Sequence, residues 1–150
     1  ATNVLRIAGK KAAFFTLVGD CLKGFLPVLI AQQLVDDPLL VALVAFAAFA
    51  GHCFPLFFNF RGGKGVATAL AATVAYHWLT GAIIIGIWLL FAKVFRISSL
   101  AAIIAFCALP PLIFWYQQSL AVSAVFLAIS TILIWRHRGN IQRLLQGTEG

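Results

Sequence analysis

Residues 66–92 read VATALAATVAYHWLTGAIIIGIWLLFA, and this stretch decides the fold of the chain. A helix needs about 20 apolar residues to cross the hydrocarbon of a bilayer, with a usual range of roughly 17 to 25. The stretch is longer than one upright crossing, and the sequence YHWLTG at residues 76–81 interrupts it. It therefore forms either one long helix or a hairpin of two short helices.

The positions of the Lys and Arg residues favour the hairpin. If the chain turns near residues 77–81, ten of its eleven cations lie on one side of the membrane, and the other side holds Asp36, Asp37 and residues 116–119 without a cation. A single crossing would divide the cations between the two sides. Because cytoplasmic loops carry an excess of Lys and Arg, we expect six crossings, with the cationic side and both ends of the chain in the cytoplasm. The ten cations are Arg6, Lys10, Lys11, Arg61, Lys64, Lys93, Arg96, Arg136, Arg138 and Arg143.

The remaining sequence is also typical of a membrane protein. Four other apolar runs, residues 12–35, 39–58, 98–116 and 119–135, are long enough to cross a bilayer. Of the 150 residues, 63% are hydrophobic and 10% charged, whereas a soluble domain has about 45–50% and 25%. A soluble fold is excluded, because it could not hide this apolar surface from water. We predict an all-α polytopic membrane helical bundle, a single integral-membrane domain over residues 1–150, with no nucleic acid as a partner.

The cysteines and the first residues of the chain bear on metal binding and completeness. Cys21, Cys53 and Cys107 stand singly in apolar runs without the spacing of metal ligands, so we predict no metal site. The chain has no methionine and opens on ATNVLR, without the regions of a signal peptide. We therefore expect that residues are missing before Ala1.

The densest polar group is the glycine loop, which we define as residues 61–65, RGGKG. Its glycines let backbone N–H groups converge on a ligand, the following helix offers a positive N-terminal end, and Lys64 adds a full charge, so the loop suits a phosphate. It is not a nucleotide-binding P-loop, because Phe58 and Gly65 stand where that motif has Gly and Ser or Thr. The alternative is a flexible turn whose cations reach the lipid headgroups.

Two further polar groups lie on the predicted cytoplasmic side. Asn3 and Arg6 are three residues apart, so on a helix they share a face and can hold one anion together; the alternative is a basic helix start facing headgroups. Ser98 and Ser99 precede an apolar run. They predict a helix N-cap, and such a helix start can also bind phosphate.

The segment at residues 136–149, RHRGNIQRLLQGTE, predicts a short amphipathic helix capped by Asn140. His137 is expected to titrate near neutrality and either to donate to a phosphate, to move a proton, or only to decorate the interface. Glu149 is the one carboxylate assigned to this side of the membrane, and we expect it to pair with a cation and hold the site together.

Asp20, Lys23 and His52 receive a structural role. Asp20 and Lys23 are three residues apart inside the first apolar run, so they can pair on one helix face. Charges inside a membrane are costly and indicate a functional interior by default, so a functional pair is the alternative to an ion pair that fixes packing. His52 comes shortly before Pro55 and is expected to cap the glycine loop or contact a ligand.

The cationic side has no Ser–His–Asp or Cys–His arrangement and no His followed five residues later by Asp. Cations, glycines, Asn, Ser and His without a strong base suit a reaction between anionic substrates with a good leaving group. Phosphate transfer, or acyl transfer from an acyl phosphate, fits this composition.

Three motifs carry a resemblance to a known family: ATNVLR with Gly9 and Lys10, GHCFP at residues 51–55 with GGKGVAT at 62–68, and the segment at 136–149. In this order and spacing they resemble the bacterial PlsY family of membrane acyl-phosphate:glycerol-3-phosphate acyltransferases, over essentially the whole chain. The family has one more N-terminal crossing and a Ser-Gly-rich stretch before ATN. The resemblance thus implies an N-terminally truncated chain of a protein with about seven crossings.

The resemblance implies transfer of an acyl group from acyl phosphate to the 1-hydroxyl of glycerol 3-phosphate. The products are 1-acylglycerol 3-phosphate (lysophosphatidic acid) and phosphate, in phospholipid biosynthesis. The reaction needs no metal or other cofactor and takes place at the cytoplasmic face of the bacterial inner membrane. The implied partners are glycerol 3-phosphate, acyl phosphate, membrane lipid and the enzyme that forms acyl phosphate.

The resemblance assigns the site residues by their positions in the three motifs. We expect Arg6, Lys64, the loop amides and Ser98 or Ser99 to hold the two phosphate groups, with a substrate phosphate oxygen as proton acceptor and His137 as the alternative base. The expected catalytic residues are Arg6, Lys64, Ser99, His137 and Asn140. The expected substrate-binding residues are Asn3, Arg6, Gly62, Gly63, Lys64, Gly65, Ser98, Ser99 and His137, and Glu149 is expected to support the structure.

Two other classes of protein remain as alternatives. A small anion transporter should carry polar residues through the membrane midplane, where the sequence places only Asp20 and Lys23. A structural membrane subunit would leave the glycine loop, Asn3 and His137 without a purpose. The sequence therefore favours the enzyme.

Overall fold

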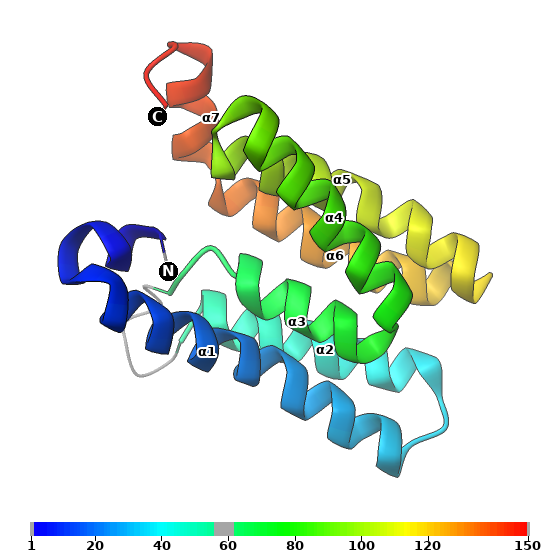
Figure 1. Cartoon of the computed structure of the whole chain (residues 1–150). Coiled ribbons are helices and arrows are strands. Elements are labelled where there is room, and N and C mark those ends of the chain that lie inside the picture. Colours follow the sequence, from blue (N-terminus) through cyan, green and yellow to red (C-terminus); the bar gives the residue numbers. More distant parts are fainter. Residues whose placement is uncertain (1, 56–61, 150) are drawn as a thin grey trace.

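The computed structural model describes the backbone of residues 2–55 and 62–149, and the side chains of these residues from Ile7 onward. All regular structure in these ranges is helical, which confirms the all-α prediction (Figure 1). The helices are α1 (Thr2–Leu34), α2 (Pro38–Cys53), α3 (Val66–Tyr76), α4 (Trp78–Phe95), α5 (Ser98–Gln117), α6 (Leu120–Arg136) and α7 (Arg138–Leu145).

Local chemistry sets several helix boundaries. α1 is broken near its start by Gly9, whose φ of 80° lies in the left-handed region that glycine adopts without strain. α2 begins with Pro38 at its first position and Asp37 as N-cap, whose carboxylate accepts from the Leu39 N–H at 2.8 Å. The break that the sequence leaves between the apolar runs 12–35 and 39–58 is therefore a turn between two helices.

The predicted hairpin is present, but only α3 is short, because α4 continues to Phe95 and is long enough to span a membrane. α3 ends at Tyr76, and His77 both terminates α3 and caps α4, with its Nδ1 accepting from the Thr80 N–H at 3.3 Å. The two helices pack closely because Gly81 meets the backbone of Val74, where a Cβ would lie 2.6 Å from the Val74 Cα.

Six apolar helices, α1 to α6, run back and forth in two groups, with α1, α2 and α3 in one and α4, α5 and α6 in the other (Figure 1). Contacts of α3 with α4 and of α2 with α6 join the groups. The core between them contains fully buried side chains such as Phe49, Phe106 and Phe126. Gly24 lets α1 approach α3, because a Cβ there would lie 2.1 Å from the carbonyl oxygen of Thr68.

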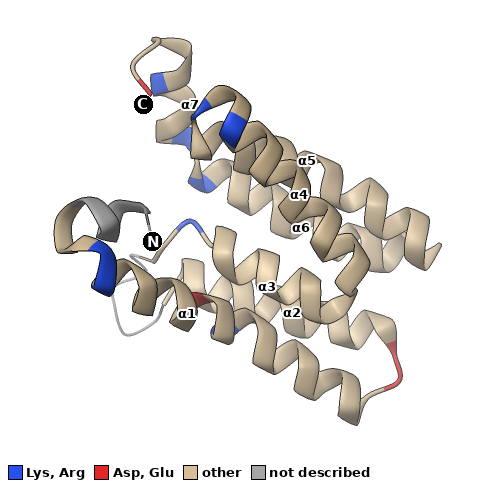
Figure 2. Cartoon of the chain, in the orientation of Figure 1, with Lys and Arg blue, Asp and Glu red and all other residues tan. Residues whose placement is uncertain are grey.

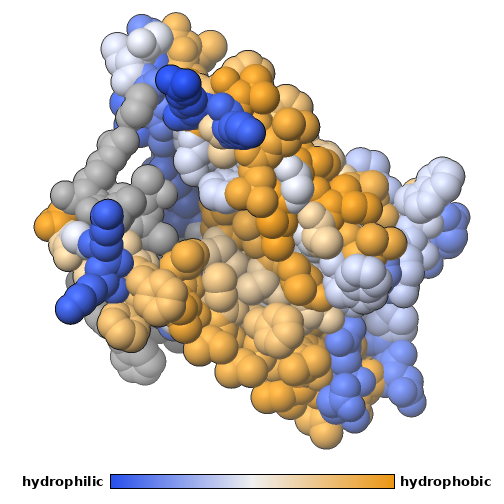
Figure 3. Space-filling model, in the orientation of Figure 1, coloured by the Kyte–Doolittle hydropathy of each residue, from blue (hydrophilic) through white to orange (hydrophobic). Residues whose placement is uncertain are grey.

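Except for Lys23 within α1, the described cations gather at the end of the bundle that holds the N-terminus, the α2–α3 connection, the α4–α5 turn and α7 (Figure 2). The acidic turn between α1 and α2 lies at the opposite end. The face of the molecule seen in Figure 3 is largely hydrophobic between the ends, and large apolar side chains of the described helices, such as Phe15 at 71%, are exposed. This surface suits lipid, and the charge asymmetry agrees with the predicted grouping of cations.

The helix lengths correct two details of the prediction. Within the described residues, Ile7–Leu34, α4 and α5 are each long and apolar enough to cross a membrane, whereas α6 qualifies only together with α7, which is bent from it by 56°. α2 and α3 are shorter apolar helices, so helix length alone does not establish six full crossings. The run predicted over 39–58 ends as a helix at Cys53, because Pro55 biases the residue before it away from helical geometry.

Candidate active site

Glu149 connects three segments at the cationic end. Its Oε1 accepts from the Ser99 hydroxyl at 2.7 Å and from the Asn140 side-chain amide, and its Oε2 accepts from the Arg143 Nε at 2.6 Å. The side chain is only 11% exposed. Burial opposes the charged form, but the hydrogen bonds from Ser99, Asn140 and Arg143 outweigh it and lower the pKa of Glu149 to about 2. The expected pairing of Glu149 with a cation is present.

Lys64 joins the glycine loop to α7. Its Nζ donates to the Asn140 Oδ1 at 2.6 Å, so two of the expected catalytic residues, Lys64 and Asn140, are brought together. α7 begins at Arg138 with His137 as N-cap, and Asn140 lies in its first turn. The prediction that Asn140 caps this helix is therefore wrong, because its side chain is engaged by Lys64 and Glu149.

The serines at the start of α5 also behave differently from the prediction. The N-cap of α5 is Ile97, and no side chain caps this helix. Ser99 is buried and bonds Glu149, whereas Ser98 is exposed. Only Ser99 thus belongs to the Glu149 cluster.

Packing explains the loop's glycines. Gly65 caps α3 with a φ of 79°, and a Cβ there would lie 2.3 Å from the Phe49 ring. A Cβ on Gly63 would lie 2.3 Å from the His52 Nε2, and one on Gly62 2.2 Å from the His52 carbonyl oxygen. In the part of the chain that the structure describes, the N–H groups of residues 62–65 donate to no other protein group. Gly63 and Lys64 are exposed whereas Gly65 is buried, so the N–H groups of Gly63 and Lys64 are the candidate donors to an anion, beside the N-terminal end of α3.

His137 is 2% exposed and sits between α6 and α7. Its Nδ1 donates to the Leu133 carbonyl oxygen at 2.8 Å, which leaves Nε2 with the lone pair of a neutral imidazole. Burial lowers the pKa of His137 below its ordinary value, and the charge of Lys64 acts in the same direction, against the Leu133 hydrogen bond and Glu149. His137 is thus neutral at neutral pH, so the expected titration near neutrality moves to lower pH.

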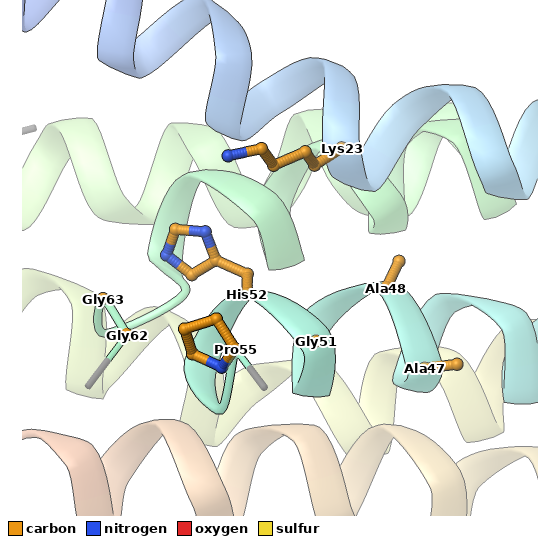
Figure 4. Close-up of a pocket in the computed structure, with 8 residues that line it drawn as sticks. All are labelled: Lys23, Ala47, Ala48, Gly51, His52, Pro55, Gly62 and Gly63. Atoms are coloured by element: carbon orange, nitrogen blue, oxygen red, sulfur yellow. The ribbon is translucent and has the colours of Figure 1, made fainter. Parts of the chain in front are cut away.

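Asp20, Lys23 and His52 form a cluster beside the glycine loop. Asp20 Oδ1 lies 3.8 Å from the Lys23 Nζ, as expected for a pair on one helix face, and 3.4 Å from the His52 Nδ1. The Thr68 hydroxyl donates to the Asp20 carbonyl oxygen at 3.0 Å. The cluster borders a cavity of about 480 Å³ between α1, α2 and the loop (Figure 4). Its lining residues are Lys23, Ala47, Ala48, Gly51, His52, Pro55, Gly62 and Gly63.

The side chains of two expected site residues lie outside the described residues, and a residue that was not expected in the site contacts the glycine loop. Asn3 and Arg6 lie in the first turns of α1, and their side chains fall outside the described residues. Arg136, which the sequence pattern only places among the cations of one side, donates from its guanidinium to the Gly62 carbonyl oxygen. The sequence signal for a role of Arg136 in the site was its position directly before the expected site residue His137.

A family model described as glycerol-3-phosphate acyltransferase matches residues 1–147. The chain belongs to the glycerol-3-phosphate acyltransferase family. A glycerol-3-phosphate acyltransferase of Methylococcus capsulatus is 46% identical over 149 residues, which cover 99% of this chain and 75% of that relative. The corresponding protein of Hydrogenovibrio crunogenus is 49% identical over 151 residues, covering 99% and 72%.

Solved structures of PlsY, an integral membrane glycerol 3-phosphate acyltransferase, have the same fold. The lysophosphatidic acid form matches with a TM-score of 0.92 and 37% identity, over 99% of this chain and 76% of that one. The glycerol 3-phosphate form matches with a TM-score of 0.93 at the same identity, over 99% and 75%. The resemblance to PlsY, including its integral membrane fold, is thereby confirmed.

Proposed function

We propose that this chain transfers an acyl group from acyl phosphate to the 1-hydroxyl of glycerol 3-phosphate, giving lysophosphatidic acid and phosphate. Membership of the family supports the acceptor and the product class. The observation that carries the proposal is the hydrogen-bonded cluster of Lys64, Asn140, Glu149 and Ser99. It lies beside a glycine loop whose described N–H groups donate to no described protein group. The choice of acyl phosphate as the donor goes beyond what membership of the family supports.

Lys64 is the anchor for a substrate phosphate. Its described partner is the neutral amide oxygen of Asn140, and no described carboxylate lies within ion-pair distance of it. Glu149 is instead matched by Arg143. A phosphate that displaces Asn140 from Lys64 gains a charge-assisted hydrogen bond, and the loop amides and the α3 N-terminus add further donors. Arg6, Asn3, Ser98 and Ser99 complete the binding set in this proposal.

Positioning and electrostatics supply the catalysis. The 1-hydroxyl oxygen attacks the acyl carbon, the bond from that carbon to the bridging oxygen breaks, and phosphate leaves with the bridging oxygen. Holding both anions beside several donors raises the effective concentration of the hydroxyl and stabilises the developing charge. With its low pKa and three hydrogen-bond donors, Glu149 is a poor base. A phosphate oxygen of the substrate therefore takes the hydroxyl proton, and His137 Nε2 is the alternative acceptor.

The charge asymmetry supports a proposal for the site's position relative to the membrane. We propose that α1 to α6 cross the bacterial inner membrane and that the cationic end faces the cytoplasm. Glycerol 3-phosphate is dissolved on that side, and the phosphate head of acyl phosphate is exposed to water there. The acyl chain extends sideways into the lipid. An acyl-phosphate-forming enzyme supplies the donor on the same side.

The test is incorporation of labelled glycerol 3-phosphate into lipid by membranes that contain the protein, with acyl phosphate, acyl-CoA and acyl carrier protein thioester offered in parallel. Membranes with Lys64→Ala at equal protein level provide the control. Incorporation with acyl phosphate alone supports the proposal. Incorporation with a thioester alone would retain the acyltransferase and overturn the donor, and no incorporation with any donor would overturn the activity.

A further inference from the structure

One side chain contacts both ends of the connection between α2 and α3. Arg136, the last residue of α6, donates to the Gly62 carbonyl oxygen at the far end of the connection. Its guanidinium carbon also lies 5.5 Å from the centre of the Phe54 ring, directly after α2. Gly62 in turn packs against the end of α2, within 2.5 Å of the Cys53 carbonyl oxygen for a Cβ placed there.

The hydrogen bond to Gly62 determines the direction of a loop amide. A peptide group is planar and trans, so fixing the carbonyl of Gly62 also fixes the N–H of Gly63, which points the opposite way. That N–H belongs to the set that donates to no described protein group. Arg136 therefore orients one of the donors that the proposed function assigns to a substrate phosphate.

The loop is supported from its other side by α2. The His52 Nε2 lies against Gly63, where a Cβ would come within 2.3 Å, and the His52 Nδ1 lies 3.4 Å from the Asp20 carboxylate. The loop thus sits between a guanidinium from α6 and an imidazole from α2. Its next residue, Lys64, reaches Asn140 on α7.

We propose that Arg136 is a positioning residue for the glycine loop in glycerol 3-phosphate binding, an inference that rests on the proposed function. It acts through Gly62 and Phe54 and does not contact the reacting atoms. A lysine cannot replace it, because a planar guanidinium can lie over an aromatic ring and donate in its plane at once, whereas an ammonium is a compact point charge.

The experiment compares the kinetics of Arg136→Ala, Arg136→Lys and Arg138→Ala in the full-length protein in membranes, with acyl phosphate and varied glycerol 3-phosphate. Arg138 is a matched control, because it is exposed, its guanidinium lies over Trp135 at 4.4 Å, and its described hydrogen bond goes to the Trp135 carbonyl oxygen and not to the loop. We expect the KM for glycerol 3-phosphate to rise about tenfold or more in Arg136→Ala, as for loss of a charged hydrogen bond. The kcat should change less, and Arg138→Ala should stay within about twofold.

Chemical rescue separates positioning from a general structural role. Added methylguanidinium should lower the raised KM of Arg136→Ala and leave Lys64→Ala unchanged. If Arg136→Ala does not accumulate in membranes, Arg136→Lys keeps the charge and decides alone: a raised KM supports the inference, and wild-type kinetics overturn it. An Arg136→Ala enzyme with unchanged KM also overturns it. Absence of transfer by the wild-type protein with every donor would instead refute the proposed function.

Discussion

The Lys64 Nζ lies 2.6 Å from the Asn140 Oδ1, which connects the glycine loop to α7 across 76 positions of sequence. The side-chain N–H of Asn140 donates to the Glu149 carboxylate, which also accepts from the Ser99 hydroxyl at the start of α5. Four segments of the chain therefore share one hydrogen-bonded cluster at the cationic end. The charge of Lys64 is not matched by a described carboxylate, because its hydrogen-bond partner is the neutral amide of Asn140.

Lys64→Ala should abolish transfer while leaving membrane insertion intact. Loss of a single donor to a developing charge costs about 10²–10³ in kcat, and the substrate phosphate also loses its anchor. Radiolabelled transfer at equal protein level measures the effect, with exposed Lys11→Ala as the control. We predict the same loss for Arg6→Ala. Turnover near the wild-type level in either variant would exclude that residue from the site.

Glu149 should make the protein sensitive to acid. Its pKa is about 2 in the folded protein and about 4.5 ordinarily, so its contribution to stability is present above about pH 4.5 and is lost as the pH falls toward 2. Thermal unfolding in detergent should show a melting temperature that falls over this window. Glu149→Gln should lower the melting temperature at pH 7 and flatten that fall. A variant with the wild-type pH dependence would mean that Glu149 is not the titrating group.

His137→Gln should lower kcat by less than about 100-fold and leave the acid limb of the pH profile in place. The reason is that a substrate phosphate takes the proton, whereas general base catalysis contributes about 10²–10⁴. Because the pKa of His137 is lowered, any His137-dependent loss of wild-type activity lies on the acid side of its ordinary value. Disappearance of the acid limb in the variant would identify His137 as the base.

Gly65→Ala should reduce the amount of folded protein. The new methyl group would meet Phe49 and Cys53 at under 3 Å, at a backbone φ of 79° that alanine rarely adopts. Gly86→Ala on α4 is the matched control, because no atom lies within 4 Å of its Cβ position. Size-exclusion profiles and thermal unfolding compare the two. Equal stability would show that the loop can relax around the methyl group.

Much of the fold could be predicted because its signals are local. The polar residues at 76–81 and the distribution of cations predict the hairpin, and His77 then provides the cap that ends one helix and starts the next. The end of α2 was misplaced because residues 54–58 are apolar whether or not they are helical. Pro55 was the only local sign that the helix stops.

Residue types in the sequence could predict which residues belong to the site, but not which of them contact one another. The glycine loop, Asn140 and Glu149 stand out by residue type, but sequence spacing cannot show that Ser99 bonds a carboxylate 50 positions away. Ser98 and Ser99 fit an N-cap by pattern, yet Ile97 holds that position. Arg136 was overlooked because a cation at a helix end near the membrane surface has the same pattern whether it anchors the helix or orients a loop.

We propose that the acyl carbon, and not phosphorus, is attacked at this site. Acyl phosphate labelled with ¹⁸O at the bridging oxygen tests it, with glycerol 3-phosphate as acceptor and mass spectrometry of the products. We predict that the label leaves in inorganic phosphate, and that lysophosphatidic acid carries none at its new ester oxygen. Label retained in free fatty acid, with a phosphorylated acceptor as the other product, would contradict it.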